Sequence, residues 1–395
     1  MTATVRLTRW FDVRDAFRRK ELRQALYDAG GAVMSDCLLN LHGTAHRDRR
    51  RVENRLFRRS TFEHWEHGIL APTIAETLRP HITAGSGDLV VIGYRLAMNL
   101  TANVAGLDLD PADADRSNAL LAIVSKLSEG ATAAHSTRNP DALNAEVGDA
   151  LQRLDHEFLS PAIRTRSSAA EPGRATADVL STLLYHGTDL GLSDESLRRE
   201  IGFYLQAGAH STAHTLVHSF EHWWTWAQRT KRDPFAVDLD LLQRVVHESL
   251  RLHPASPIAL RRAIEPVELP NGTTLAAGEE VVLDLMAANR DREIFGSSAD
   301  VFDPERQPAE GAPLWGHSFG GGVHSCIGRE LDGGVPVAER PQNDSLPLHG
   351  TVAVMLAALL DHRFEPDPDD SPEPLATSTR DHHGRFPVRI RKQVQ

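Results

Sequence analysis

The strongest restriction on the fold comes from a helical hydrophobic pattern that runs without a break from Ser193 to about Gln228. Ser193 can cap free N–H groups at its start, and the acids Asp194 and Glu195 suit the positive end of a helix dipole. At about 1.5 Å per residue, such a helix is about 50 Å long, which exceeds the width of one domain. We therefore expect a long central helix that crosses the whole molecule.

The rest of the chain is also predicted to be mainly helical. A second helix is expected at 239–252, capped by Asp238 and ended by His253 and Pro254, because proline cannot continue the hydrogen bonding of a helix. The strand-like segments are short and occur at 267–269, 273–275, 280–283 and 386–390. The predicted fold class is therefore mainly α with small β-sheets.

Charge and composition exclude several kinds of protein. The 43 Lys and Arg against 54 Asp and Glu give a formal net charge of −11, which argues against a general nucleic-acid binder. Hydrophobic residues make up 41% of the chain, enough for a sizeable buried core. The start of the chain is dense in charge and no run of about 18 apolar residues occurs, so we expect a cytoplasmic protein without a leader or a membrane span.

Two segments without periodicity, 167–174 and 332–347, are rich in Gly, Pro, Ser and charged residues. Such composition predicts surface loops and not interdomain linkers. Because the chain also has no internal repeat, we expect residues 1–395 to form a single domain.

The segment 319–328, Phe-Gly-Gly-Gly-Val-His-Ser-Cys-Ile-Gly, carries the most information about function. The chain has only two cysteines, Cys37 and Cys326, too few for a disulfide framework or a structural zinc site. Glycines let a backbone pass close to a flat prosthetic group, and N–H groups before a helix stabilise a thiolate. Cys326 is thus predicted to be a ligand thiolate, and the alternative is an inert cysteine buried in a glycine-rich turn.

This segment resembles the haem-ligand loop of the cytochrome P-450 family, Phe-Gly-x-Gly-x-(His or Arg)-x-Cys-x-Gly, at every fixed position. The resemblance implies that Cys326 is the axial ligand of a haem iron, that His324 contacts a haem propionate and that Phe319 packs beside the sulfur. Gly320 and Gly328 are the matching glycines of this cofactor loop.

Two further motifs occur in the order that the family has them. Glu248 and Arg251 match its Glu-x-x-Arg pair, and Arg306, in a Phe-x-Pro-x-Arg-like stretch, matches the arginine that completes the pair. In the family this group is structural and is buried beneath the haem. Taken alone, Glu248 and Arg251 could instead be a solvated surface ion pair.

The resemblance also assigns partners to the haem propionates. His46 and Arg50 match a His-x-x-x-Arg stretch, and Arg261 matches an Arg-x-Ala stretch. An imidazolium and guanidinium groups suit two carboxylates in a partly dry pocket because they form charge-assisted hydrogen bonds. For Arg47 and Arg49 we expect a solvated helix face, and the basic patch could dock an acidic ferredoxin.

Residues 207–212, Ala-Gly-Ala-His-Ser-Thr, lie where the family has Ala-Gly-x-(Asp or Glu)-Thr-(Thr or Ser). In the family the glycine makes room for a diatomic ligand, and the acid and alcohol help to deliver protons. Gly208 and Thr212 keep the pattern, whereas His210 replaces the acid and Ser211 the first Thr. Both replacements can relay protons. The alternatives are a polar-face histidine without that role and a serine bonded to a helix carbonyl.

Four histidines, His210, His214, His218 and His222, repeat every four residues along the same predicted helix. Adjacent members could hold zinc, but no acidic third ligand is evident and the row drifts around the helix.

The resemblance covers about residues 7–364 and implies a cytochrome P-450-like fold and a haem-thiolate monooxygenase. It further implies haem b as cofactor, a small or medium organic substrate, and ferredoxin with ferredoxin reductase as electron donors. The changes at His210 and Ser211 motivate an alternative, a peroxide-driven or radical-coupling relative. A silent activating partner of another enzyme is a third reading, although such relatives lose the ligand cysteine. The N-terminus is short for the family, and the helix after Cys326 is interrupted by an insertion at about 332–347.

Overall fold

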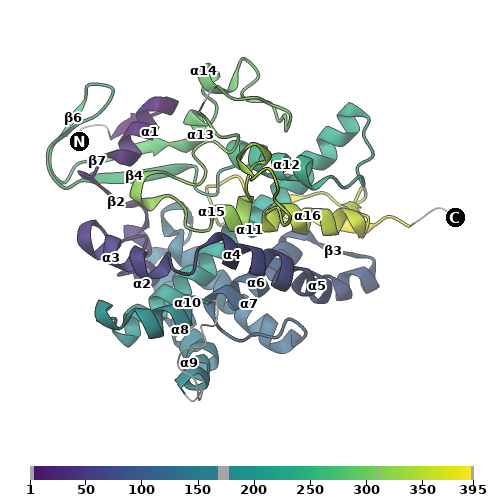
Figure 1. The fold of residues 1–395 in the computed structure, drawn as a ribbon, viewed down its shortest axis with the longest axis horizontal. Coiled ribbons are helices and arrows are strands. Elements are labelled where there is room, and N and C mark those ends of the chain that lie inside the picture. The colour runs from purple at the N-terminus through teal and green to yellow at the C-terminus, as the bar shows by residue number, and fades with distance from the viewer. Residues whose placement is uncertain (1–3, 168–177, 310, 393–395) are drawn as a thin grey trace. The chain divides into compact units, whose positions relative to one another are not determined.

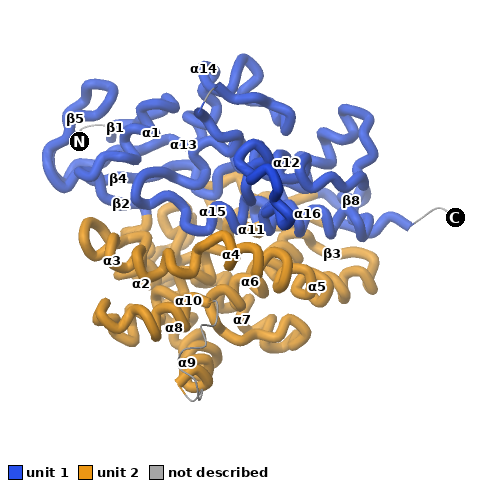
Figure 2. The backbone as a smooth tube through the Cα atoms, in the orientation of Figure 1, with its two compact units in different colours: residues 1–26, 214–371, 388–395 blue, residues 27–213, 372–387 orange. Residues whose placement is uncertain are grey.

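The computed structural model describes residues 4–167, 178–309 and 311–392. The chain divides into two compact units, each assembled from segments far apart in the sequence (Figure 2). The first unit comprises Met1–Leu26, His214–Ser371 and Val388–Gln395, and the second comprises Tyr27–Ala213 and Pro372–Pro387. The predicted loop at 167–174 lies, after Ser167, outside the described residues.

The predicted long helix is α11 (Asp194–Thr230), which has 37 residues (Figure 1). The Ser193 hydroxyl accepts a hydrogen bond from the N–H of Ser196 at 3.0 Å, as expected of a residue that caps a helix. The boundary between the two units falls inside α11, so this helix contributes residues to both.

A four-stranded sheet in the first unit has the order β1 (Val5–Leu7), β7 (Glu280–Asp284), β4 (Ile258–Ala263), β2 (Leu22–Gln24). β1 and β7 are parallel and the other pairs antiparallel. Burial alternates along β4 and β7, as it does in a sheet with one covered face. Apolar residues of this sheet share a core with Val13 and Phe17 of α1 (Trp10–Arg18), which brings α1 and β4 together.

The second predicted helix of the first unit is α12 (Leu239–Leu252), and its bounds and cap agree with the prediction. The Asp238 carboxylate accepts from the N–H groups of Asp240 and Leu241 at 3.1 and 3.2 Å. The other elements of this unit are the hairpin β5 (Val267–Glu268) and β6 (Thr274–Leu275), α13 (Leu285–Ala288), α14 (Arg292–Phe295), the 3₁₀ turns η6 (Gly322–His324) and η7 (Val337–Glu339), α15 (Arg329–Gly333), α16 (Thr351–Asp361), and the antiparallel pair β8 (Phe364–Pro366) and β11 (Pro387–Ile390).

The interruption after Cys326 takes the form of a short helix followed by an irregular segment up to Gly350. α12 anchors this segment, because Gln243 Nε2 donates to the carbonyls of Gly333 and His349, each at 3.1 Å. Asp240 accepts from Arg340 at 2.6 Å. The predicted surface loop at 332–347 is thus held on α12 and does not continue a long helix.

The second unit is mostly helical. Its elements are η1 (Leu26–Gly30, which begins at the boundary), α2 (Gly31–Met34), α3 (Gly43–Glu53), α4 (Arg59–Glu63), the π-helical η2 (His64–Leu70), α5 (Ala71–Ala84), β3 (Ser86–Asp88), α6 (Leu89–Ala105), α7 (Ala114–Ala131), η3 (Ala133–His135), α8 (Pro140–Leu154), the π-helical η4 (Asp155–Leu159), α9 (Ser160–Ser167), α10 (Val179–His186), η5 (Thr188–Leu190), β9 (Glu373–Pro374) and β10 (His383–Arg385).

A segment near the C-terminus, 372–387, completes the second unit. β9 and β10 pair in antiparallel fashion, and Ser378 bridges to Ser136. The N–H of Thr379 donates to the carbonyl of His135 at 2.8 Å, which fixes the position of the next residue, Arg380. Among the described residues, none of the helices combines the length and apolar character that crossing a membrane requires.

Candidate functional site

The glycine-rich turn before Cys326 lies against the end of α1. Gly320 and Gly322 adopt left-handed backbone angles, with φ of +67° and +64°. A Cβ atom on Gly322 would lie 1.9 Å from the Phe17 carbonyl oxygen, so a side chain cannot be accommodated there without moving the backbone. The glycines therefore let this turn approach α1 closely.

Cys326 lies at the end of this turn and its side chain is exposed. Its N–H donates to the carbonyl of Phe319 at 2.9 Å, which closes the loop. Gly328, the last glycine of the motif, is the N-cap residue of α15. The alternative of a buried cysteine is wrong, because the side chain of Cys326 is exposed.

Phe319 anchors the other end of the loop and is buried. Its ring packs edge-on against Trp315, with centroids 5.8 Å apart, and lies close to Gly333, where an added Cβ would be 3.1 Å from the ring. His247 of α12 contacts the same two residues through a 2.7 Å hydrogen bond to the Gly333 carbonyl and an edge-on contact with Trp315. Burial lowers the pKa of His247 to about 4, so its ring is neutral near pH 7.

Arg261 and the cysteine loop share a contact with Phe17. Arg261 is buried on β4, donates to Gln24 Oε1 at 2.6 Å, and lies over the Phe17 ring at 5.1 Å. The Phe17 backbone faces Gly322 of the cysteine loop. Phe17 therefore contacts both the Arg261 guanidinium and this loop. His324, at the end of η6 and two residues before Cys326, is half-buried.

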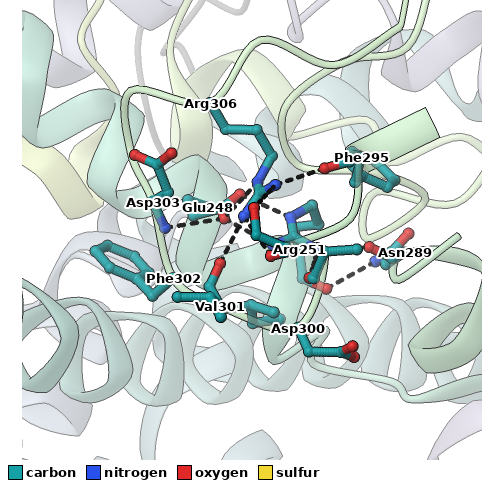
Figure 3. A network of polar contacts seen from close by, with 12 residues as sticks. Glu248, Arg251, Asn289, Phe295, Asp300, Val301, Phe302, Asp303 and Arg306 are labelled. Atoms are coloured by element: carbon teal, nitrogen blue, oxygen red, sulfur yellow. Dashed lines mark hydrogen bonds and ion pairs between the residues drawn. The ribbon is translucent and has the colours of Figure 1, made fainter. Parts of the chain in front are cut away.

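Glu248 and Arg251 of α12 form a buried cluster with Arg306 (Figure 3). Arg251 donates to both oxygens of Glu248 at 2.7 Å, and Arg306 Nε donates to Glu248 Oε1 at 3.0 Å. Glu248 and Arg251 are 0% exposed and Arg306 is 6% exposed, so the alternative of a solvated surface pair is wrong.

The same cluster fixes the loops that lie before the cysteine turn. Arg251 donates to the carbonyls of Asn289 and Ala299 at 2.7 Å, and Arg306 donates to that of Phe295 at 2.5 Å. The side chain of Asn289 in turn binds the hydroxyl of Ser318 at 3.0 Å, next to Phe319. Hydrogen bonds therefore link the buried ion pairs to the start of the turn.

His46 and Arg50 lie one helical turn apart on α3 of the second unit. His46 is buried, and burial, together with the positive charge of Arg50, lowers its pKa to about 4. The ring is therefore neutral near pH 7 and is not the imidazolium expected from the sequence. Arg50 donates to Asn54 at 3.0 Å.

Arg47 and Arg49, on the same helix, differ from each other. Arg47 is exposed, as expected, and donates to Thr44 at 2.9 Å. The expectation for Arg49 is wrong: it is buried and ion-paired with Glu200 of α11. Because Glu200 is 151 positions away in the sequence, the residues next to Arg49 could not indicate this ion pair.

On α11, Gly208 allows a neighbouring helix to pack closely, and Ser211 forms a hydrogen bond within the helix. A Cβ on Gly208 would lie 2.7 Å from the Thr101 hydroxyl, so the glycine permits close approach of α6. The Ser211 hydroxyl donates to the carbonyl of Ala207 at 2.6 Å, which is the helix back-bond named as its alternative role. Thr212 is buried.

His210 is also buried, and hydrogen bonds engage both of its ring nitrogens. Nδ1 contacts the hydroxyl of Tyr94, and Nε2 lies 2.6 Å from Arg380 Nη2. Because a guanidinium only donates, Nε2 must accept and the ring is neutral with its proton on Nδ1. His210 is thus not on a solvated polar face.

Sequence reasoning missed Tyr94 and Arg380, which surround His210. Arg380 also donates to Thr132 at 3.1 Å, and the His382 ring lies 5.6 Å from that of His210. These residues come from α6, the end of α7 and the 372–387 segment, so no local motif could have indicated them. In the first unit, His218 and His222 of the histidine row pack on His253, with ring centroids 4.2 and 5.0 Å apart.

Known proteins resemble this chain both in part of its sequence and in its fold. Residues 234–331, from before α12 to α15, match the Cytochrome P450 family model. The crystal structure of CYP109E1 from Bacillus megaterium in complex with testosterone has a TM-score of 0.74 to this chain, with 20% sequence identity over 98% of this chain and 94% of that one.

Two curated relatives are similar over part of the chain. Cytochrome P450 CYP94D108 of Paris polyphylla is 27% identical over 45% of this chain, and cyclooctat-9-en-7-ol 5-monooxygenase of Streptomyces melanosporofaciens is 32% identical over 42%. The alignment spans 40% of the length of each relative. Together with the shared fold, these matches support the predicted resemblance to the cytochrome P450 family, and the predicted fold class is confirmed.

The residues present fit the haem that this family implies. An exposed cysteine thiol at the end of a glycine turn is a soft ligand of the kind that binds haem iron. In the same unit, the buried guanidinium of Arg261 is a suitable partner for a carboxylate.

Proposed function

We propose that this protein is a haem-thiolate monooxygenase that oxidises a small or medium organic molecule with dioxygen. The exposed thiol of Cys326, on its glycine turn in a chain with the cytochrome P450 fold, carries the proposal. One partly similar relative is named as a 5-monooxygenase of cyclooctat-9-en-7-ol, which agrees with a small-molecule substrate. Ferredoxin and ferredoxin reductase supply the electrons, and the exposed Arg47 and Arg51 suit an acidic partner of this kind.

Haem b is the proposed cofactor. Cys326 would bind its iron on a loop shaped by the backbone at Gly320 and Gly328, Phe319 would lie beside the sulfur, and His324 and Arg261 would contact propionates. For His46 and Arg50 the role of propionate partners rests on the sequence resemblance alone. A thiolate-bound haem iron activates dioxygen because the sulfur donates electron density to the metal.

Glu248, Arg251 and Arg306 are proposed to be structural. Their ion pairs and their bonds to the carbonyls of Asn289, Phe295 and Ala299 hold the loops that precede the cysteine turn. A rigid turn keeps the thiolate where it must bind the metal, so these residues act through Cys326 and do not touch the substrate.

A second function is favoured by the hydrogen bonds on α11. Delivery of protons in the family uses an acid and an alcohol, but here His210 accepts from Arg380 and Ser211 donates to a helix carbonyl. A proton relay through His210, Ser211 and Thr212 therefore needs these bonds to rearrange. An enzyme that uses hydrogen peroxide does not need this proton relay, because peroxide already contains the electrons and protons that dioxygen would have to receive.

Replacement of Cys326 tests the proposal. The purified protein reconstituted with haem b is expected to show a thiolate-type absorption spectrum with carbon monoxide in the reduced state. Cys326→Ser is expected to abolish this spectrum and to reduce turnover to background, because a hydroxyl is a poor donor to haem iron. The matched control is Cys37→Ser, since Cys37 is buried in the second unit and bonds to the Val33 carbonyl at 3.1 Å. A thiolate spectrum that survives in Cys326→Ser overturns the proposal.

The two functions are separated by their oxidants. Product per NADPH, with an added ferredoxin and its reductase, is compared with product per hydrogen peroxide for the same substrate. Efficient turnover with the reduced partners and little with peroxide supports the monooxygenase, and the opposite result supports the peroxide-driven enzyme.

A further inference from the structure

A buried group of four side chains joins α3 to α11 in the second unit. Glu200 and Tyr204 lie one turn apart on α11, and Arg49 and Glu53 lie one turn apart on α3. Glu200 is 0% exposed, Glu53 1%, Arg49 5% and Tyr204 6%. Water is excluded from the group, so its charges must balance locally.

The hydrogen bonds in the group distinguish the two carboxyl groups. Arg49 is ion-paired with Glu200 Oε2, and the N–H of Leu38 donates to both Glu200 oxygens at 3.2 and 3.1 Å. Glu53 Oε2 instead accepts from the Tyr204 hydroxyl at 2.5 Å, and among the described residues its Oε1 has no hydrogen-bond partner although it is buried. Glu200 thus has an ion pair and two N–H contacts that favour a carboxylate, whereas Glu53 has a single donor, so Glu53 is the carboxyl that holds a proton more readily.

The charge count indicates that the pair holds one proton. One guanidinium within the group faces two carboxyl groups, and two neighbouring carboxyls at a dry site do not both ionise. Burial raises the pKa of Glu53 to about 7, although the bond from Tyr204 and the charge of Arg49 lower it. Burial and the neighbouring Glu53 raise the pKa of Glu200 well above its usual value too, so the charge is placed on Glu200 by its ion pair with Arg49 and its bonds from the Leu38 N–H and not by the pKa values.

We infer that Glu53 and Glu200 hold one proton between them, on Glu53 in its resting state, and that this proton keeps α3 docked on α11. With the proton in place, the two carboxyls carry one negative charge, which Arg49 neutralises. Loss of the proton leaves an unbalanced carboxylate between the two helices, and their contact weakens.

Other charged and titratable groups lie around this pair. Arg50 on α3 acts on Glu53, and Cys37 in the preceding loop interacts with Glu200. Asp36 and Arg199 act on Cys37 in turn, and His186 at the end of α10 contacts Arg55. Arg199 is paired with Glu195 at 2.6 Å, and burial raises the pKa of the Cys37 thiol so that it stays neutral. Arg50 lowers the pKa of Glu53, but its side chain is partly exposed, so water screens its charge.

The shared proton also bears on the cofactor, a step that rests on the proposed function. α3 carries His46 and Arg50, the two propionate partners proposed in this unit. When the contact between α3 and α11 weakens, the positions of the His46 and Arg50 side chains become less fixed. Haem is therefore expected to dissociate more slowly at about pH 6 than at about pH 8.5.

The pH dependence of stability tests the shared proton in the purified protein. A carboxyl whose pKa is higher in the folded than in the unfolded chain adds stability at low pH, and this stability is lost as the pH rises through about 7. The unfolding temperature should therefore fall between about pH 6 and pH 8.5. Glu53→Gln keeps an oxygen for Tyr204 without a charge and should remove most of this fall, whereas Asp48→Asn, at a partly exposed site on α3 that pairs with Arg51, should leave it unchanged. The same fall in Glu53→Gln as in the unaltered protein overturns the inference.

Infrared spectroscopy provides a readout that does not depend on stability. The unaltered protein at about pH 6 should show the carbonyl stretch of a buried carboxylic acid, and the band should vanish as the pH rises through about 7. Tyr204→Phe removes a donor to the charged form, so the band should persist to higher pH even if Glu53→Gln does not fold. A protein without this band at about pH 6 overturns the inference. Because the band is independent of haem, a protein that shows it but binds no haem contradicts only the proposed function.

Discussion

At the scale of the residue, the two hydrogen bonds of His210 set its protonation. Protonation of Nε2 would break the bond from Arg380 and place two positive charges together, which costs about 4 kcal/mol at 4 Å and an effective dielectric constant of about 20. We expect nitrogen-15 spectra of histidine-labelled protein to show His210 as the Nδ1–H tautomer between about pH 6 and pH 8. Arg380→Gln removes the opposing charge and should let His210 titrate in that range. Titration of His210 in the unaltered protein would contradict this assignment.

Contacts between side chains could be predicted from the sequence where the partners are close along the chain. Glu248 and Arg251 are three residues apart, so their spacing alone indicated that they could meet, as they do. Arg49 was misjudged because its partner, Glu200, is 151 positions away, and the contact of His210 with Arg380, 170 positions away, was equally absent from the local sequence. Burial by distant segments made Arg49, expected on a solvated face, a member of a buried polar group.

At the scale of the element, the turn that ends at η6 depends on glycine for two different reasons. Gly320 and Gly322 both have positive φ, which costs an L-residue about 1–2 kcal/mol. A Cβ on Gly320 would find its nearest neighbour at 3.6 Å, but one on Gly322 would meet the Phe17 carbonyl at 1.9 Å. We therefore expect Gly320→Ala to destabilise the protein by about 1–2 kcal/mol and Gly322→Ala by more, because α1 must also move. Denaturant unfolding of both variants measures the difference, and equal losses would contradict a close contact between the turn and α1.

The helices with strong local signals were predicted with their caps, and the segments fixed by distant bonds were not. α11 and α12 have apolar residues at helical spacing, and Ser193 and Asp238 mark their starts. The 372–387 segment has no comparable periodicity. Its place in the second unit depends on bonds to His135 and Ser136, which only the folded chain brings near.

At the scale of the whole molecule, each compact unit is built from segments that are distant in the sequence. The first unit needs its N-terminal strands, the chain after Ala213 and the C-terminal strand before its core is complete. Composition and linker signals describe neighbours along the chain, so they could not reveal this division. The buried cluster around Glu248 has the same property, because it joins α12 to loops some 40 to 60 residues later.

Because that cluster joins so many segments, the first unit as a whole should respond to its loss. Glu248→Gln leaves Arg251 and Arg306 buried without their counter-charge, and breaking a buried ion pair in this way costs about 3–5 kcal/mol. Glu305→Gln is the matched control, since its pair with Arg232 is exposed and should contribute less than about 1 kcal/mol. Chemical denaturation measures both losses, and hydrogen exchange locates them. We expect faster exchange at 289–306 and around the cysteine turn in Glu248→Gln, with α3 unchanged. Exchange that rises equally in α3 would mean that the cluster does not act through the first unit.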